Sequence, residues 1–192
     1  MNQDFWDLIK SGDETAYAEL YNNYADQLYS YGMKIIPNDE LVSELIQSLF
    51  VNIYERRNFL SYPISIKAYL FSSLKRMLIR AENRKNNNIS FDEIENIHHH
   101  FKLELDVEAA LIKQQYEECF LHYIQSLLDS LSPRQRESIY LKYYKNHSNE
   151  EIADILEISN QAVRNLIYKA LCRMRSLQPK NNNIISHTQH HK

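Results

Sequence analysis

Glycine is nearly absent from this chain, and its scarcity restricts the available folds more than any other feature. The 192 residues include only 2 glycines and 4 prolines, while leucine, isoleucine, tyrosine, glutamate and lysine are plentiful. Tight β-turns rely on glycine, asparagine and proline for their special backbone angles, so a β-sandwich or barrel would lack its turn residues. The sequence therefore predicts an all-α protein, long enough for two small domains or one of medium size.

Helical periodicity divides the first part of the chain into three long segments. Apolar residues recur every three or four positions over 13–31, 39–54 and 66–81, and Pro37 separates the first two segments. Such spacing gives each helix one apolar face that must be buried. We expect these helices to pack together as one domain over residues 1–85.

The pattern then breaks and resumes. Residues 86–110 are rich in asparagine, histidine and acidic side chains without a sustained period, which predicts a flexible, exposed acidic linker. Helical spacing returns over 111–178 and predicts a second small domain. The polar residues 179–192 predict a disordered tail.

Two helix starts in the second domain are unusually well marked. Ser132 precedes Pro133 and Gln135, an arrangement typical of a capped helix with proline in its first turn. Ser148 and Glu151 form a second capping box, which begins a very short apolar-faced helix. The sequence thus predicts several short helices in this domain rather than one long helix.

The segment 148–176 has the organisation of a helix-turn-helix. The short helix after Ser148 ends at a tight turn over 157–159, and a longer helix follows over 160–176. In this motif the second helix enters the DNA major groove. The side of this helix opposite its apolar stripe, with its flanks, carries Gln161, Arg164, Asn165, Tyr168, Lys169 and Arg175. These side chains suit base edges and phosphates, although an ordinary surface helix with a solvated face is the alternative.

Charge is sorted along the chain although the net charge is only −3. Residues 53–85 carry 8 basic and 2 acidic side chains, and residues 160–180 carry 5 basic and no acidic ones. Residues 1–50 and 92–118 are acidic, with 9 and 8 acidic side chains against 2 basic ones in each. Two basic islands predict two places that meet a polyanion, and chance clustering on solvated helix faces is the alternative.

Three segments resemble one protein family in the expected order. The stretch from Leu128 to Arg175, with its Ser-Pro-Arg-Gln-Arg-Glu and Ser-Asn-Glu-Glu-Ile-Ala runs, is similar to the minus-thirty-five-reading domain of extracytoplasmic-function sigma factors. Residues 39–57 and 66–80 resemble the clamp-binding and minus-ten helices of the same family. The resemblance covers most of the chain outside the linker and the tail.

The resemblance implies a role for particular residues. The residues that fall on the family's polymerase-docking motif are Glu44, Gln47 and Phe50, with Glu44 replacing the usual aspartate. The loop 58–64 falls where the family captures an unstacked minus-ten base, and Phe59 and Tyr62 offer stacking surfaces, although anchoring of the loop in the core is the alternative for either ring. The cations expected to hold the opening strand are Lys67, Lys75, Arg76 and Arg80. The family more often has asparagine and aspartate at the last two positions, so the arginines should favour backbone attraction over base-specific contact.

The resemblance also implies a function and its partners. We expect a transcription initiation factor that binds core RNA polymerase and promoter DNA, with an anti-sigma factor as its inhibitor. The alternative is a helix-turn-helix DNA-binding regulator that does not act as a polymerase subunit.

Other classes are poorly supported. We expect no enzyme, because Gly12 and Gly32 lie too far apart to form a phosphate-cradling loop, and no cofactor. We expect no metal site, because three consecutive histidines at 98–100 cannot all face one ion on a regular helix. We also expect no membrane insertion, because no run approaches the ~20 apolar residues that a membrane span needs. Two cysteines without Cys-x-x-Cys spacing favour a reducing, cytoplasmic location.

Overall fold

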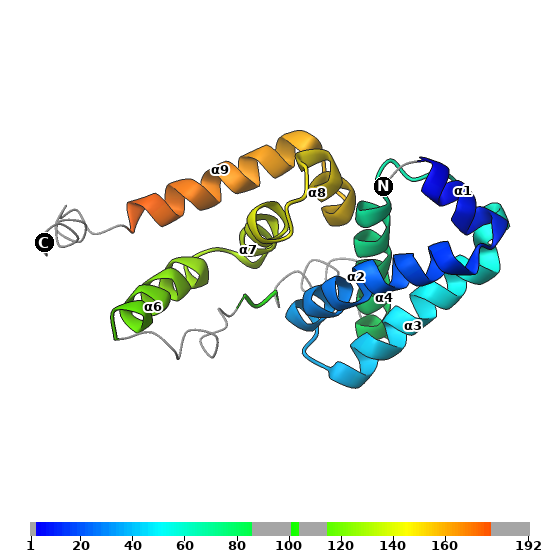
Figure 1. Cartoon of the computed structure of the whole chain (residues 1–192). Helices are drawn as coiled ribbons and strands as arrows, with labels where there is room; N and C mark the ends of the chain where they lie inside the picture. Colours follow the sequence, from blue (N-terminus) through cyan, green and yellow to red (C-terminus); the bar gives the residue numbers. More distant parts are fainter. Residues whose placement is uncertain (1–2, 86–100, 104–114, 178–192) are drawn as a thin grey trace, which may run out of the picture.

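The structure is a computed structural model that describes residues 3–85, 101–103 and 115–177. Every regular element in these ranges is helical, which confirms the all-α prediction. The helices form an N-terminal and a C-terminal group that lie side by side (Figure 1). The predicted tail and most of the predicted linker lie outside the described residues.

The N-terminal group contains the three helices that periodicity predicted and one that it did not. Its elements are α1 (Gln3–Ser11), α2 (Glu14–Ile35), α3 (Asp39–Arg56), the 3₁₀ turn η1 (Arg57–Phe59) and α4 (Ile66–Lys85). Asp13 begins α2 by accepting a hydrogen bond from the Ala16 amide at 2.8 Å, and Asn38 begins α3 in the same way. These caps satisfy amides that have no partner within the helix, which explains why the helices start where they do.

A close approach between α2 and α3 depends on Gly32. A Cβ atom at this position would lie 2.8 Å from Cγ1 of Val42, which is fully buried on α3. Only glycine leaves room for that contact, so Gly32 sets how closely the two helices pack.

Three helices of the C-terminal group begin where the sequence predicted them to begin. Its elements are α6 (Gln115–Asp129), α7 (Pro133–Ile139), the π-helical turn η5 (Tyr140–Tyr144), α8 (Asn149–Leu156) and α9 (Asn160–Ser176). Both predicted capping boxes are present, with Ser132 and Ser148 as the N-caps of α7 and α8. Pro133 occupies the first turn of α7 as predicted, where a missing amide hydrogen costs nothing.

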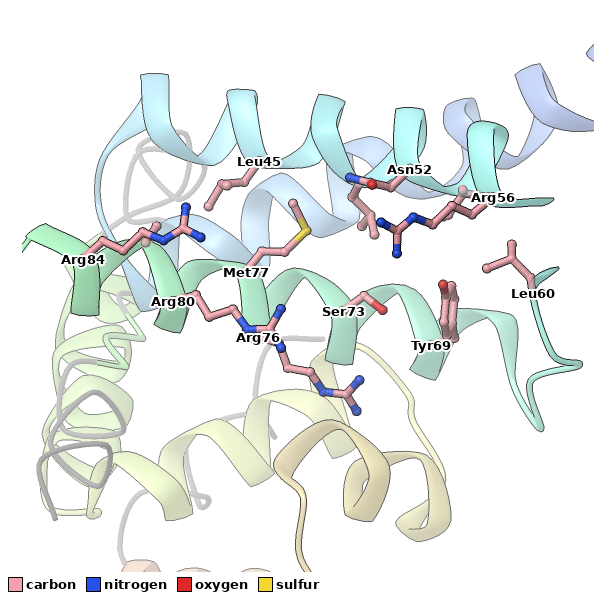
Figure 2. A pocket seen from close by; sticks show the side chains of 13 residues that line it. Leu45, Asn52, Arg56, Leu60, Tyr69, Ser73, Arg76, Met77, Arg80 and Arg84 are labelled. Carbon is pink, nitrogen blue, oxygen red and sulfur yellow. The ribbon is translucent and has the colours of Figure 1, made fainter. Parts of the chain in front are cut away.

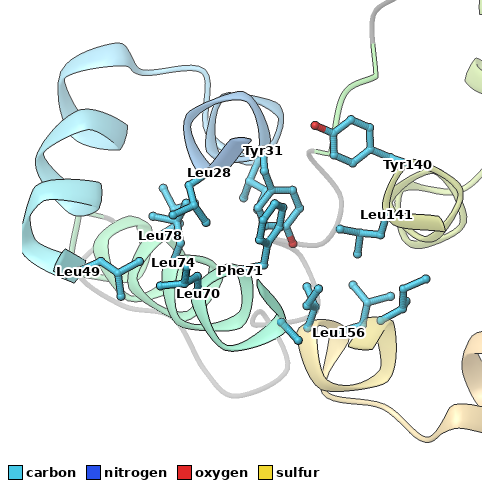
Figure 3. Close-up of a cluster of buried hydrophobic side chains, with 14 of the residues drawn as sticks. Leu28, Tyr31, Leu49, Leu70, Phe71, Leu74, Leu78, Tyr140, Leu141 and Leu156 are labelled. Carbon is cyan, nitrogen blue, oxygen red and sulfur yellow. The ribbon is translucent and has the colours of Figure 1, made fainter. Parts of the chain in front are cut away.

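The two groups share one continuous apolar core rather than two separate ones. Figure 3 shows Tyr31 and Phe71 of the N-terminal group facing Tyr140, Leu141 and Leu156 of the C-terminal group. The rings of Tyr31 and Tyr140 are nearly parallel, with centroids 6.3 Å apart. We call this interface, where α2 and α4 meet α7, η5 and α8, the seam.

The tripeptide Phe101–Leu103 corrects one prediction. It falls in the segment expected to be exposed, yet Phe101 is only 2% exposed and Leu103 is 9% exposed. Phe101 packs against both Tyr31 and Tyr140, and the Lys102 amide donates a hydrogen bond to the Lys34 carbonyl at 2.9 Å. Two large apolar side chains in a polar segment are buried because the seam offers them an apolar site. The tripeptide therefore contacts both groups.

Candidate nucleic-acid interface

The helix-turn-helix is formed by α8 and α9 and is held by side-chain caps at both helix starts. The Ser148 hydroxyl accepts from the Glu151 amide at 3.1 Å, and the Glu151 carboxylate accepts from the Ser148 amide at 2.9 Å. Glu157 ends α8 in the left-handed conformation, with φ of 54°, and Ser159 then caps α9. This short turn fixes the angle at which α9 leaves α8.

The two faces of α9 are separated as the sequence predicted. Val163, Ile167 and Ala170 are buried against the rest of the domain. The residues predicted to read or hold DNA, Gln161, Arg164, Asn165, Tyr168, Lys169 and Arg175, are all exposed. The Gln161 amide donates to Asn165 Oδ1 at 3.2 Å, which aligns two adenine-reading side chains next to each other. The structure thus brings these six residues onto one free surface.

Only part of the predicted polymerase contact on α3 lies on the surface. Glu44 and Gln47 are exposed, and no described residue bonds to their side chains. Phe50, in contrast, is 2% exposed and packs edge-on against Tyr21 with ring centroids 4.9 Å apart. Phe50 is therefore too buried to contact a partner directly. Its ring instead anchors α3 on α2.

The end of η1 and the loop that follows it expose two aromatic residues and are tied to α1. Phe59 is 89% exposed, and Tyr62 is half-exposed with its hydroxyl bonded to Asp7. Lys10 donates to the Leu60 carbonyl at 2.8 Å, and Trp6 donates to the Ser61 carbonyl at 3.2 Å. Sequence reasoning gave α1 no role, although the apolar spacing of its residues was visible. The helix positions the loop predicted to capture a base.

A groove of about 600 Å³ runs between α3 and α4 beside this loop (Figure 2). Four arginines line it, Arg56, Arg76, Arg80 and Arg84, together with apolar side chains such as Leu45 and Met77. Arg76 and Arg80 were predicted to hold DNA, whereas Arg56 and Arg84 were not singled out. Clustered guanidinium groups over an apolar floor suit a strand of phosphates and bases.

Two predicted cations of α4, Lys67 and Lys75, point into the seam, and Arg76 is bonded across its exposed edge. Lys75 is 5% exposed, and its ammonium lies 2.8 and 3.0 Å from the two carboxylate oxygens of Glu137, which is itself 2% exposed. Lys67 donates to the Lys145 carbonyl, and Arg76 lies 2.6 Å from the Glu157 carboxylate. Three of the four cations predicted to hold DNA are therefore bonded to the C-terminal group.

Buried polar groups accompany these contacts. The Tyr31 hydroxyl donates to Glu137 at 2.6 Å, and burial raises the pKa of this tyrosine well above its usual value. His147 is buried against Phe71, and burial lowers its pKa to about 4, with the nearby charge of Lys67 acting in the same direction. The histidine is therefore neutral at pH 7.

Other kinds of site find no support in the described part of the chain. None of its helices is both long and apolar enough to cross a membrane. Among the same residues, no group of three or more histidine, cysteine, aspartate or glutamate side chains is placed to hold a metal ion. The histidines at 98–100 lie outside the described residues.

Comparisons with known proteins agree with this geometry. The family described as Sigma-70, region 4 matches residues 121–174, which include α7, α8 and all but the last two residues of α9. The ECF RNA polymerase sigma factor SigM of Bacillus subtilis is 24% identical over 162 residues, covering 83% of this chain and 93% of SigM. The similarity therefore extends well beyond the helix-turn-helix into the N-terminal group.

Two solved structures share the fold. CnrH, in complex with the cytosolic domain of CnrY, has a TM-score of 0.57 and 19% identity, covering 90% of this chain and 94% of CnrH. RpoE of Bartonella quintana, in complex with the anti-sigma factor NepR, has a TM-score of 0.54 and 18% identity, covering 83% and 94%.

Residues 121–174 thus match the Sigma-70, region 4 family, and within them α8 and α9 form a helix-turn-helix whose second helix has an exposed polar face. Over most of its length the chain is similar to an extracytoplasmic-function sigma factor, in agreement with the resemblance of its sequence.

Proposed function

We propose that this protein binds core RNA polymerase and directs it to promoters, with α3 docking on polymerase and α9 reading the minus-thirty-five element. The observation that carries the proposal is the exposed reader face of α9 within the matched region 4 domain. A DNA-binding regulator that works without polymerase would need only the helix-turn-helix domain, whereas the similarity to SigM spans 83% of the chain. The role requires no chemical step from the chain itself, and it places the protein in the cytoplasm with polymerase and DNA.

In this proposal the minus-ten element meets the N-terminal group. Phe59 and Tyr62 receive an unstacked base, since both rings are accessible on a loop that α1 holds. The arginines of the groove then bind the phosphates on either side. Arg56 and Arg84 join Arg76 and Arg80 in this role because all four line the same groove.

Docking through α3 can be tested with a charge reversal. Changing Glu44 and Gln47 together to lysine should abolish association with core polymerase, because both side chains are exposed and lie in the predicted contact. Association is measured by pull-down with purified core enzyme, and circular dichroism checks that the helices remain.

The matched control lies on α2. Glu19 and Asn22 are exposed, have the same spacing and undergo the same charge change when both become lysine. This control should bind polymerase normally. Equal affinity of both double variants for polymerase would show that docking does not use this face of α3.

We also propose an anti-sigma partner. The support is that RpoE was solved with an anti-sigma factor and CnrH with the cytosolic domain of CnrY. A true partner must bind the purified chain, compete with core polymerase and reduce transcription in a reconstituted reaction. A protein that binds without affecting transcription would not be this inhibitor.

A further inference from the structure

A second cavity, of about 290 Å³, lies between α4 and α8. It shares Arg76 and Arg80 with the groove between α3 and α4, but its other lining residues are different. Its volume equals that of about ten water molecules at about 30 Å³ each, and it lies at the lower end of the range for small-molecule sites. The cavity therefore suits a small ligand rather than a nucleic-acid strand.

Part of the cavity lining is apolar. Ile155 and Leu156 of α8 are buried, and Ile79 of α4 is partly buried. All three side chains line the cavity, and none of them lines the groove. An apolar ligand group that enters the cavity would leave water and contact these side chains, which is favourable. The lining therefore predicts a ligand with an apolar body.

The three cations that line the cavity differ in whether they have a partner. Lys75 is bonded to both carboxylate oxygens of Glu137. Arg76, which extends from α4 toward the C-terminal group (Figure 2), lies 2.6 Å from the Glu157 carboxylate. Arg80, in contrast, forms no hydrogen bond or ion pair with any residue in the described part of the chain. Because the other two charges are already paired, one positive charge remains for a ligand.

Asn83 adds a side-chain amide with unused hydrogen-bonding capacity. It follows Arg80 by three positions on α4, so the two side chains project from neighbouring positions of the helix surface. Its Oδ1 atom is buried and has no hydrogen-bond partner among the residues that the structure describes. The amide can therefore turn and donate from its nitrogen to an anionic oxygen held by Arg80, because no existing bond has to break.

From this lining we infer that the cavity between α4 and α8 binds a small carboxylic acid with an apolar body. The carboxylate lies on Arg80 and Asn83, and the apolar body lies against the three aliphatic side chains of the lining. A carboxylate fits better than a phosphate monoester, which brings roughly two negative charges at pH 7 to one free cation beside the Glu157 carboxylate. The inference goes beyond the proposed function, because it concerns the free chain without polymerase or DNA.

The test titrates the full chain with three probes at pH 7 and follows binding by isothermal titration calorimetry. Octanoate has both predicted features, acetate has the charge without the apolar body, and 1-octanol has the apolar body without the charge. Octanoate should bind at a single site, and each of the other two probes should bind at least about tenfold more weakly. If either of them bound as tightly as octanoate, or if octanoate did not bind, the inference would be overturned.

A pair of charge variants locates the bound octanoate. Arg80→Gln removes the free cation and should weaken octanoate binding on the order of tenfold. Arg84→Gln is the matched control, because Arg84 is also exposed on α4 but lines only the groove. This control should bind octanoate as the wild-type chain does. Equal weakening in both variants would place octanoate in the groove, and unchanged binding in Arg80→Gln would remove the cation from the site. Either result would overturn the inference.

A second pair of variants tests the apolar lining without changing any charge. Ile79→Phe enlarges a side chain that lines only the cavity, and Met77→Phe enlarges one that lines only the groove. Ile79→Phe should abolish octanoate binding because the larger ring fills the space, whereas Met77→Phe should bind octanoate normally. Circular dichroism checks the fold of both variants, and octanoate binding by a folded Ile79→Phe variant would contradict the inference. If Ile79→Phe does not fold, the exposed pair Arg80→Gln and Arg84→Gln decides.

Discussion

Two kinds of side chain share the exposed face of α9, and they predict different responses to substitution. Arg164 lies near the N-terminal end of the helix beside Gln161 and Asn165, where a recognition helix meets base edges. Lys169 and Arg175 follow further along the helix and are placed to meet phosphates. Reading and holding are therefore assigned to different positions of one helix.

If Arg164 grips a base, Arg164→Ala should cost about 1–3 kcal/mol on the preferred promoter and less on one altered at the contacted position. Lys169→Ala should instead weaken binding similarly on all sequences and lower the salt slope by roughly one unit. Both effects are measured with the polymerase-bound protein on single-base promoter variants. The assignment is reversed if Lys169→Ala changes the preferred base while Arg164→Ala does not.

His147 predicts how stability changes with pH. Its pKa in the folded protein is about 4, against 6.5 for an ordinary histidine, because burial and the charges of Lys67 and Lys145 outweigh the opposing effect of Glu151. The unfolded chain therefore takes up the proton first, so stability from this group is complete above about pH 6.5 and is lost as the pH falls towards 4.

Urea unfolding should show this loss as on the order of 2–3 kcal/mol between pH 7 and pH 4. In His147→Asn the part of the pH dependence that lies between pH 6.5 and about 5 should disappear, because the carboxyl groups of Glu150 and Glu151, whose pKa values are lowered from 4.5, affect stability only below that interval. An unchanged pH profile in this variant would show that another group titrates there.

Phe50 and Lys75 show that a role carried over from a family's motif to a single residue can fail. Both match the family's functional positions, but Phe50 is buried against Tyr21 and Lys75 against Glu137. The apolar periodicity of α3 already placed Phe50 on its buried face, so the sequence contained the signal for that correction. It contained no signal for Lys75, since its partner lies 62 positions away.

At the scale of elements, local signals predicted helix starts well. Ser132 and Ser148 both cap helices as expected, because a cap depends only on residues within one turn. The helix α1 was not predicted, although its apolar residues have helical spacing over nine residues. Its stability comes from tertiary contacts such as those of Trp6, which is 1% exposed.

The approach of α2 to α3 predicts a double-mutant result. Gly32→Ala should destabilise the protein by about 1 kcal/mol, because overpacking against Val42 costs about 1–3 kcal/mol while alanine returns about 0.8–1 kcal/mol of helix propensity. In the background of Val42→Ala the same substitution should stabilise, since the obstructing methyl groups are gone. Denaturant unfolding of the four proteins measures this coupling, and additive effects would show that the two helices do not meet as described.

At the scale of the whole molecule, the sequence predicted two helical groups but not how they meet. The seam is held by pairs such as Tyr31 and Glu137, which are 106 positions apart, and no periodicity connects residues at that separation. The distribution of charged side chains along the sequence did indicate two basic segments. It could not show that acidic residues of one group cover the first island, because that depends on the packing of α4 against α8.

The central claim is that this chain makes core RNA polymerase start at particular promoters. Run-off transcription with purified core enzyme, genomic fragments and this protein tests it most directly. We predict discrete transcripts that require the protein and that disappear when Glu44 and Gln47 are both changed to lysine. The account is contradicted if the folded protein gives no transcript beyond that of core enzyme alone, or if the double variant supports transcription as well as the wild-type chain.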